Sequence, residues 1–239
     1  MNTAHHKVIL VRHDFVPNLR DVGGVVTDDG GEVVTGRVLR SAMPSAKDLV
    51  PEGIAWPPAV VIDLRSDGES ESIHPLALQG SRIVNLPLLS ALRPDLAPPE
   101  DLHGLYLMVL DHASMYLVEL VREVAAAPGA TLIHCAAGKD RTGISVALLL
   151  RLVGVSREDV LADYQLTEEA SKAIGARLHK LPGRKHRAAL PPAFLEVSTE
   201  AIVGVLDAWD GHDGGVHGWF RSIGGDDELV ARLRRTLVR

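Results

Sequence analysis

The sequence predicts an α/β fold whose sheet is mainly parallel. Three short apolar runs, at 59–64, 82–86 and 131–135, are continuous rather than alternating, which is typical of strands buried on both faces of a parallel sheet. Apolar residues at helical spacing fill most of the chain between and after these runs. Strands that alternate with helices and then give way to helices alone favour one α/β domain with a helical C-terminal elaboration.

Local patterns define the elements in order. Two β-branched segments surround an Asp-Asp-Gly-Gly turn within 25–34 and predict an N-terminal hairpin. Apolar spacings of three and four predict the first helical region, which ends before Pro128-Gly129. Gly154 is expected to cap the apolar helix before it, and Ser156 to open the next. Helices are predicted over 102–124, 142–152, 156–166 and 167–180, and from 193 to the end with breaks near Gly211, Gly214-Gly215 and Gly224-Gly225.

Length and composition set the domain organisation. The chain has 239 residues, of which 46% are hydrophobic and 23% are charged, so it can bury a sizeable core and is not wholly disordered. We expect a single domain over 1–239. Its α/β core is expected at about 18–180 and its helical C-terminal extension at about 190–239.

Charge and hydropathy exclude several classes of partner. The net charge of −6 argues against a dedicated nucleic-acid-binding protein, which needs a broad basic face. The most apolar stretch, 144–155, is shorter than the ~20 residues of a membrane-spanning helix and contains Arg151. We therefore expect no integral membrane segment. The first residues lack a secretory signal pattern, which favours a cytoplasmic location, with unsignalled secretion as the alternative.

The segment 134–143, His-Cys-Ala-Ala-Gly-Lys-Asp-Arg-Thr-Gly, carries the chemistry. A strand ends at its cysteine and a helix begins near Arg141, so the backbone N–H groups of the loop between them can bind an anion such as phosphate. The alanines let the backbone approach a ligand closely, Gly138 permits a positive φ, and Arg141 offers a planar fork for two phosphoryl oxygens. The predicted phosphate-binding residues are Ala136, Ala137, Gly138, Lys139, Asp140 and Arg141.

Cys135 is the only cysteine of the chain, which excludes an internal disulfide and a site of several thiolate metal ligands. The positive potential of the loop favours its thiolate, and a hydrogen bond from the Thr142 hydroxyl to the sulfur would add to this effect. A thiolate inside a phosphate cradle predicts attack at phosphorus, a phosphocysteine intermediate and release of phosphate by water. This chemistry requires no cofactor and no metal.

The pattern His-Cys, five residues, Arg-Thr-Gly resembles the signature of the cysteine-dependent protein-tyrosine and dual-specificity phosphatases. Together with 18–24 and 62–66, the longer motif at 138–143 is similar to an atypical bacterial branch that includes a secreted mycobacterial tyrosine phosphatase, tyrosine phosphatase B. The resemblance runs from about residue 18 to 230. It implies a cysteine-dependent phosphatase fold, with four or five mostly parallel strands between helices. It also implies hydrolysis of phosphotyrosine, with phosphoserine, phosphothreonine and phosphoinositides as further substrates.

Two aspartates compete for the role of general acid. The resemblance suggests Asp63, and its place at the end of a parallel strand agrees, because ligands bind beyond the carboxyl ends of such strands. We expect Asp63 to be the acid ahead of Asp140, which lies inside the loop. Lys139 either adds a charge for a second phosphate or an acidic peptide, or is a solvated loop residue.

Three other functions compete with a protein phosphatase. The first is a phosphoinositide phosphatase, which differs in substrate rather than in chemistry. A sulfurtransferase or an arsenate reductase also uses a cysteine loop closed by arginine, but arsenate reductases usually need resolving cysteines that this chain lacks. A non-catalytic phosphate-binding module would keep the cradle without turnover.

Overall fold

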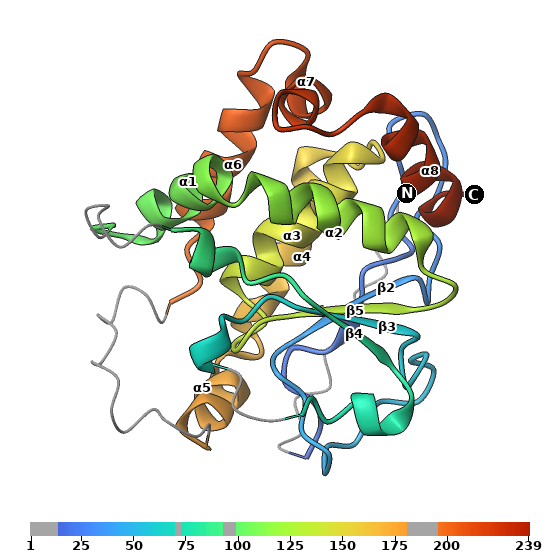
Figure 1. Cartoon of the computed structure of the whole chain (residues 1–239), viewed down its shortest axis with the longest axis vertical. Coiled ribbons are helices and arrows are strands. Elements are labelled where there is room, and N and C mark those ends of the chain that lie inside the picture. Colours follow the sequence, from blue (N-terminus) through green and yellow to red (C-terminus); the bar gives the residue numbers. More distant parts are fainter. Residues whose placement is uncertain (1–13, 70–72, 93–98, 181–195) are drawn as a thin grey trace, which may run out of the picture.

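The computed structural model describes residues 14–69, 73–92, 99–180 and 196–239. One five-stranded sheet, in the order β1-β2-β5-β3-β4, forms its centre (Figure 1). The pairs β2–β5, β5–β3 and β3–β4 are parallel, and only β1 is antiparallel to its neighbour. This arrangement confirms the predicted α/β fold. The strands are β1 (Arg20–Asp21), β2 (Val38–Ser41), β3 (Val60–Asp63), β4 (Arg82–Asn85) and β5 (Thr131–His134).

The parallel strands end in register. Ser41 pairs with His134, His134 with Asp63, and Asp63 with Asn85, so the last residues of four strands lie in one row. The loop that follows each strand therefore starts at the same edge of the sheet. This edge is where ligands bind in open α/β folds.

The two faces of the sheet are covered differently. Ile62 and Ile133 belong to the larger hydrophobic cluster, together with apolar residues of the helices that lie above the sheet in Figure 1. Val61 and Leu132 point to the other face, where a smaller cluster includes residues of irregular segments such as Val16 and Leu76. The helices are α1 (Leu102–His112), α2 (Ser114–Ala126), α3 (Asp140–Leu152), α4 (Arg157–Gln165), α5 (Ser171–Lys180), α6 (Thr199–Asp210), α7 (Gly215–Ser222) and α8 (Asp227–Leu237). Short 3-10 turns lie at η1 (Asp67–Glu69), η2 (Ala77–Gln79), η3 (Leu88–Ala91) and η4 (Leu166–Glu168).

The C-terminal helices share the core of the sheet. Helix α8 packs on α2, and α6 packs on α1 and α4. Trp209, Phe220 and Leu237 are members of the same buried cluster as the β-strand residues. This continuity supports the single domain that we propose over the whole chain.

Several predicted helix ends are confirmed. Ser156 caps α4 by accepting a hydrogen bond from the Asp159 amide, and Gly154 has the positive φ of a C-terminal cap, at 87°. The structure also shows a cap that was not predicted, Asp226 at the start of α8, whose last turn carries Arg234 and Arg235. These ends were readable because capping depends on the local sequence.

Two local predictions differ from the structure, and one strand was not predicted. The hairpin at 25–34 has its turn but only one antiparallel bridge of its own, Val26 to Glu32, because Thr27 and Val33 pair with Val155 and Val238 instead. The predicted helix over 102–124 is two helices that meet at Ala113 with a bend of 76°. Strand β2 was not predicted, since its buried Arg40 interrupts an otherwise short apolar run.

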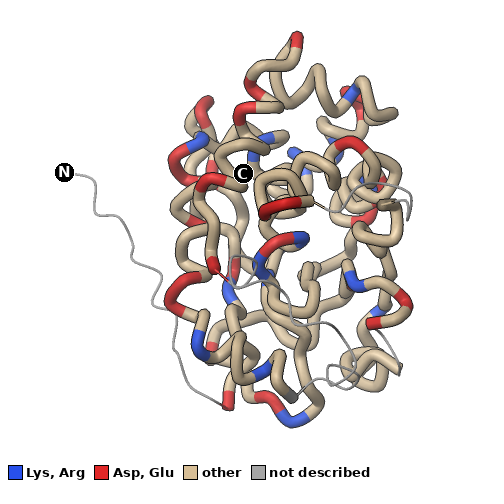
Figure 2. Tube along the Cα trace, turned by 90° about the vertical axis from the view of Figure 1, so that its left-hand side faces the viewer, with Lys and Arg blue, Asp and Glu red and all other residues tan. Residues whose placement is uncertain are grey.

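Charged residues of both signs are interspersed over the described part of the molecule, as Figure 2 shows. Many of them form ion pairs, such as Arg157 with Asp207 and Arg177 with Asp48. Within the described ranges no single helix is long and apolar enough to cross a membrane, although the bent pair α1–α2 passes by length and composition. The buried apolar faces of that pair belong to the core of the domain. The cytoplasmic location stays a prediction from the sequence.

Candidate active site

A tight loop from Cys135 to Lys139 connects β5 to the N-terminus of α3. Helix α3 begins its hydrogen bonds with the Gly143 amide donating to the Lys139 carbonyl, so the helix does not use the amides that precede Gly143. The positive end of the helix dipole lies at the same place. The local structure is therefore the anion-binding arrangement that the sequence predicts.

Gly138 is required by the shape of this loop. Its φ is +65°, and a Cβ atom at this position would lie 2.2 Å from the carbonyl carbon and oxygen of Ser41. The loop therefore passes directly over the end of β2. The Met43 amide also donates a hydrogen bond to the Ala136 carbonyl, which ties the loop to the segment after β2.

A buried polar network supports the loop from below. Asn18 Nδ2 and Arg40 Nη2 donate hydrogen bonds to the Gly138 carbonyl, at 2.7 Å and 3.1 Å. Arg40 and Arg20 each bind the Asp163 carboxylate of α4, at 2.5 Å and 2.9 Å. Burial by itself would raise the pKa of Asp163, but the charges of Arg20 and Arg40 lower it well below its ordinary value. Arg20 thus pairs with Asp163, in the network that supports the loop, and not with the neighbouring Asp21.

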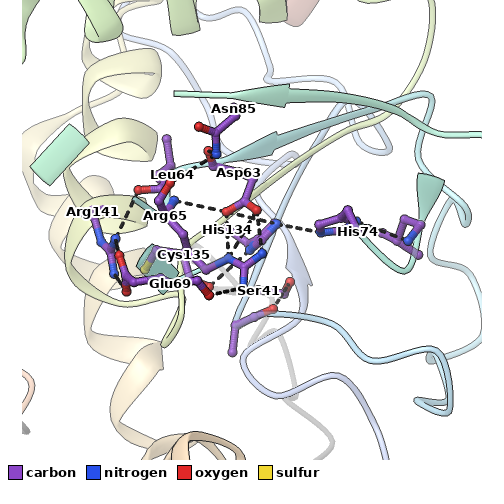
Figure 3. Close-up of polar contacts among 12 residues, drawn as sticks. Ser41, Asp63, Leu64, Arg65, Glu69, His74, Asn85, His134, Cys135 and Arg141 are labelled. Carbon is purple, nitrogen blue, oxygen red and sulfur yellow. Dashed lines mark hydrogen bonds and ion pairs between the residues drawn. The ribbon is translucent and has the colours of Figure 1, made fainter. Parts of the chain in front are cut away.

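Cys135 lies at the floor of the loop and is 2% exposed. Arg141, in the first turn of α3, extends toward the loop after β3, where Nη1 and Nη2 donate to the Glu69 carboxylate at 2.6 Å and 3.0 Å (Figure 3). Burial alone would lower the pKa of Arg141, but Cys135 and Glu69 raise it, so the guanidinium stays charged. Its Nε forms no hydrogen bond with the described residues. The Nε–H side of the guanidinium can therefore bind an anion.

Thr142 does not make the predicted hydrogen bond to the sulfur. Its Oγ1 is buried and has no hydrogen-bond partner among the described residues. Thr142 lies in the first turn of α3 and its side chain is buried. This hydroxyl therefore does not stabilise a thiolate at Cys135 in this structure.

Asp63 lies at the end of β3 but is held by Arg65. Arg65 Nη2 and Nε bind its two carboxylate oxygens at 2.7 Å and 2.9 Å, and the Arg65 amide donates a third hydrogen bond. Burial by itself would raise the pKa of Asp63, but the adjacent His134 ring and the Arg65 guanidinium lower it. Its side chain is only 3% exposed. Asp63 is thus a buried, ionised acceptor.

Asp140 has a different environment at the start of α3. The Tyr106 hydroxyl donates a hydrogen bond to its Oδ1 at 2.7 Å, and Lys139 Nζ lies 3.5 Å from the same oxygen. The Asp140 side chain is 23% exposed. Lys139 itself is buried, and its Nζ also donates to the Glu196 carbonyl at 2.6 Å. It is a tethered side chain rather than a solvated loop lysine.

Asp63, His74 and His134 form the one group of possible metal ligands within the described residues. His74 Nδ1 accepts from the Leu76 amide, so its Nε2–H can donate to His134 Nε2 at 3.0 Å. His134 Nδ1–H then donates to the Cys135 carbonyl. Burial lowers the pKa of both imidazoles, that of His74 to about 4. The group is therefore a neutral histidine pair beside an Arg65-bound carboxylate, and a metal ion would have to break these contacts.

Comparison with known proteins identifies the family. A sequence model described as the tyrosine phosphatase family matches residues 11–239. The chain belongs to the tyrosine phosphatase family. It is 31% identical over 248 residues to a Cupriavidus necator protein named as a tyrosine-protein phosphatase, covering 93% of this chain and 88% of that protein.

Two further relatives carry the same type of name. The triple specificity protein phosphatase PtpB of Mycobacterium tuberculosis is 30% identical over 47% of this chain and 45% of its own length. A tyrosine-protein phosphatase of Nostoc commune is 28% identical over 72% of this chain and 64% of its own. The protein is thus a tyrosine-protein phosphatase, and the family assignment does not favour the sulfurtransferase, arsenate reductase or binding-module alternatives.

The structure of this phosphatase brings together most of the residues predicted from the loop motif. Cys135, the loop residues that follow it and Arg141 form one site, and Asp140 borders it. Sequence reasoning missed the residues that hold these groups in place, which lie far away in the chain. They are Asn18, Arg40, Glu69, His74, Tyr106 and Tyr164. Of the segments singled out in the sequence, 18–24 begins with Asn18 and 62–66 ends shortly before Glu69.

Proposed function

We propose that this tyrosine phosphatase works through a phosphocysteine at Cys135. The Sγ atom forms a bond to phosphorus while the bond between phosphorus and the leaving oxygen breaks. Loop amides and the remaining donors of Arg141 stabilise the charge on the equatorial phosphoryl oxygens. One observation supports this proposal most directly. Cys135 begins the loop that leads to the N-terminus of α3, whose first amides make no intrahelical hydrogen bond, and the Arg141 guanidinium lies close enough to interact with it.

We assign the general acid to Asp140. A general acid must hold a proton and reach the leaving oxygen. Asp63 meets neither condition, because Arg65 occupies both of its oxygens, its pKa is lowered and its side chain is buried. Asp140 is partly exposed and belongs to the loop motif itself. The preference for Asp63 predicted from the sequence is therefore reversed.

In the second step the carboxyl group of Asp140 acts as a base, in its deprotonated form. Once Asp140 has given its proton to the leaving oxygen, its carboxylate can accept a proton from a water that attacks phosphorus. The bond between Sγ and phosphorus breaks, phosphate leaves, and the thiolate and the protonated carboxyl are restored. All groups used in this cycle belong to the chain, so no metal or cofactor is required.

We propose phosphotyrosine in proteins as the main substrate, with activity on phosphoserine and phosphothreonine. The name of the mycobacterial relative, a triple specificity phosphatase, supports a broad range. Phosphoinositides are the alternative substrate. Lys139 could favour a substrate with a second phosphate, but its Nζ already contacts the Glu196 carbonyl and Asp140. A protein substrate is therefore better supported than a phosphoinositide.

Two experiments test the proposal. Hydrolysis of p-nitrophenyl phosphate should be abolished by Cys135→Ser, whereas a variant that keeps most of its turnover would exclude the phosphocysteine. For the acid, kcat/KM is measured with p-nitrophenyl phosphate and with phenyl phosphate, whose leaving group is poorer. Asp140→Asn should slow phenyl phosphate about 10²-fold more than p-nitrophenyl phosphate. Asp63→Asn is the matched control and should affect both substrates equally.

A panel of phosphotyrosine, phosphoserine and phosphothreonine peptides, with phosphoinositides in mixed micelles, tests the substrate range. The proposal expects the highest kcat/KM for phosphotyrosine peptides. Faster hydrolysis of the phosphoinositides than of every peptide would assign the enzyme to lipid phosphatases instead.

A further inference from the structure

A line of buried hydroxyl groups ends on Asp140. The Tyr106 hydroxyl of α1 lies 2.7 Å from Asp140 Oδ1 and 2.8 Å from the Tyr164 hydroxyl of α4. The Tyr106 side chain is fully buried. Side chains of the helices α1, α3 and α4 thus form one line of hydrogen bonds that ends on the Asp140 carboxyl group. No other part of the proposed mechanism uses the two tyrosines.

The direction of the hydrogen bonds follows from the number of protons. A carboxylate oxygen can only accept, so Tyr106 donates its single proton to Asp140. The Tyr164 hydroxyl must then donate to the oxygen of Tyr106. The line therefore runs from Tyr164 through Tyr106 to Asp140.

Both phenols remain protonated donors. Burial and the neighbouring negative charge of Asp140 raise the pKa of Tyr106 well above its ordinary value, and they raise that of Tyr164 as well. Without Tyr106, Lys139 Nζ at 3.5 Å would still attract Oδ1. A lysine at this distance attracts the carboxylate without fixing its plane, whereas a hydroxyl at 2.7 Å does fix it.

We propose that Tyr106 is a positioning residue that orients Asp140 for proton transfer. This inference rests on the proposed function, in which Asp140 is the general acid. Because Tyr106 occupies Oδ1, the transferable proton of Asp140 is carried by Oδ2. Tyr164 keeps the Tyr106 hydroxyl pointed at Asp140 and acts one step further away. A misoriented acid matters only for leaving groups that need a proton, so the effect of losing Tyr106 depends on the leaving group.

The test compares Tyr106→Phe and Tyr164→Phe, alone and combined with Asp140→Asn. Both changes remove one buried hydroxyl and keep the ring, so they are matched in packing. Thermal unfolding of each variant is recorded to measure any loss of stability separately. The measured quantity is kcat/KM for phenyl phosphate and for p-nitrophenyl phosphate.

We expect Tyr106→Phe to lower kcat/KM about tenfold for phenyl phosphate and less than about twofold for p-nitrophenyl phosphate. Tyr164→Phe should give a smaller loss of the same kind. In the Asp140→Asn background, Tyr106→Phe should cause no further loss that depends on the leaving group, because the group it orients is gone.

Equal losses of Tyr106→Phe on both substrates, or an undiminished extra loss in the Asp140→Asn background, would overturn the positioning role. These outcomes leave the proposed acid intact as long as Asp140→Asn alone depends on the leaving group. If Asp140→Asn shows no such dependence, the assignment of the acid fails, and the role of Tyr106 fails with it.

Discussion

Glu69 holds both terminal nitrogens of Arg141, the arginine that follows the Cys135 loop. The same glutamate accepts a hydrogen bond from the Ser66 amide on its Oε2, and its carbonyl accepts one from Arg65 Nη1. Glu69 is therefore fixed to the segment after β3, whose Arg65 binds Asp63. The direction of the Arg141 guanidinium is set by the end of β3 and not by the loop motif alone.

Replacing this glutamate should weaken phosphate binding. Glu69→Gln keeps the shape of the side chain but loses the charge and one accepting oxygen, so the guanidinium plane is held less firmly. We expect kcat/KM for p-nitrophenyl phosphate to fall about tenfold and vanadate to bind more weakly, which isothermal titration calorimetry can measure. Tighter vanadate binding by the variant would show instead that Glu69 competes with the phosphoryl group for Arg141.

A lysine at position 141 should not replace the function of the arginine. Arg141→Lys retains one positive charge but cannot bind Glu69 and a phosphoryl group with separate donors. We expect kcat/KM to fall about 10²–10³-fold, the usual cost of losing a donor that stabilises transition-state charge. The phosphatase assay measures the loss, and circular dichroism shows whether the fold is kept. A folded variant with near-normal turnover would contradict the role of Arg141.

The loop itself should not tolerate a side chain at Gly138. A Cβ atom there would meet the Ser41 backbone at 2.2 Å, in addition to the strain of a positive φ. Gly53 has a φ of +85° with nothing within 4 Å, so Gly53→Ala isolates the strain alone. We expect Gly138→Ala to lose more than about 10²-fold in turnover. Gly53→Ala should lose only about 1 kcal/mol of stability and keep its activity. Equal activity of both variants would contradict the account of the loop.

The buried histidine pair should make stability depend on pH. The pKa of His74 is lowered from 6.5 to about 4, and that of His134 is lowered as well. Stability from the neutral rings is therefore complete above pH 6.5 and is lost as the pH falls toward 4, because the unfolded state binds more protons. We expect the free energy of urea unfolding to fall by about 2 kcal/mol between pH 7 and pH 4.5.

His74→Gln provides the matched comparison for this pH dependence. Glutamine keeps an N–H donor for His134 but does not titrate in this range. The variant should therefore lose less stability than the wild type between pH 7 and pH 4.5. An identical slope in both proteins would show that other groups cause the acid sensitivity.

The sequence predicted the elements that depend on local patterns. Three of the five strands, the caps at Gly154 and Ser156, and the strand–loop–helix unit around Cys135 were readable, because apolar runs, caps and the cysteine motif are contiguous. Strand β2 was not predicted because it depends on a contact between residues that are distant in the sequence. Its Arg40 is buried only because Asp163, 123 residues later, pairs with it.

The same distinction holds for the site. The loop motif named Cys135 and Arg141, but the groups that select between Asp63 and Asp140 are contacts made by folding. Arg65 is two residues from Asp63, and its binding could have been anticipated from that spacing. Tyr106 lies 34 residues before Asp140 and had only the pattern of a buried helix position. No local signal marked it as a partner of the loop.

Direct detection of the phosphocysteine tests the account most directly. Wild-type enzyme and Asp140→Asn are mixed with p-nitrophenyl phosphate, quenched in acid within milliseconds and digested for mass spectrometry. The account predicts the added mass of one phosphoryl group on the peptide that contains Cys135, with more of it in Asp140→Asn because hydrolysis of the intermediate is slowed. A peptide that is unmodified in both proteins during turnover, or a phosphoryl group on another residue, would contradict it.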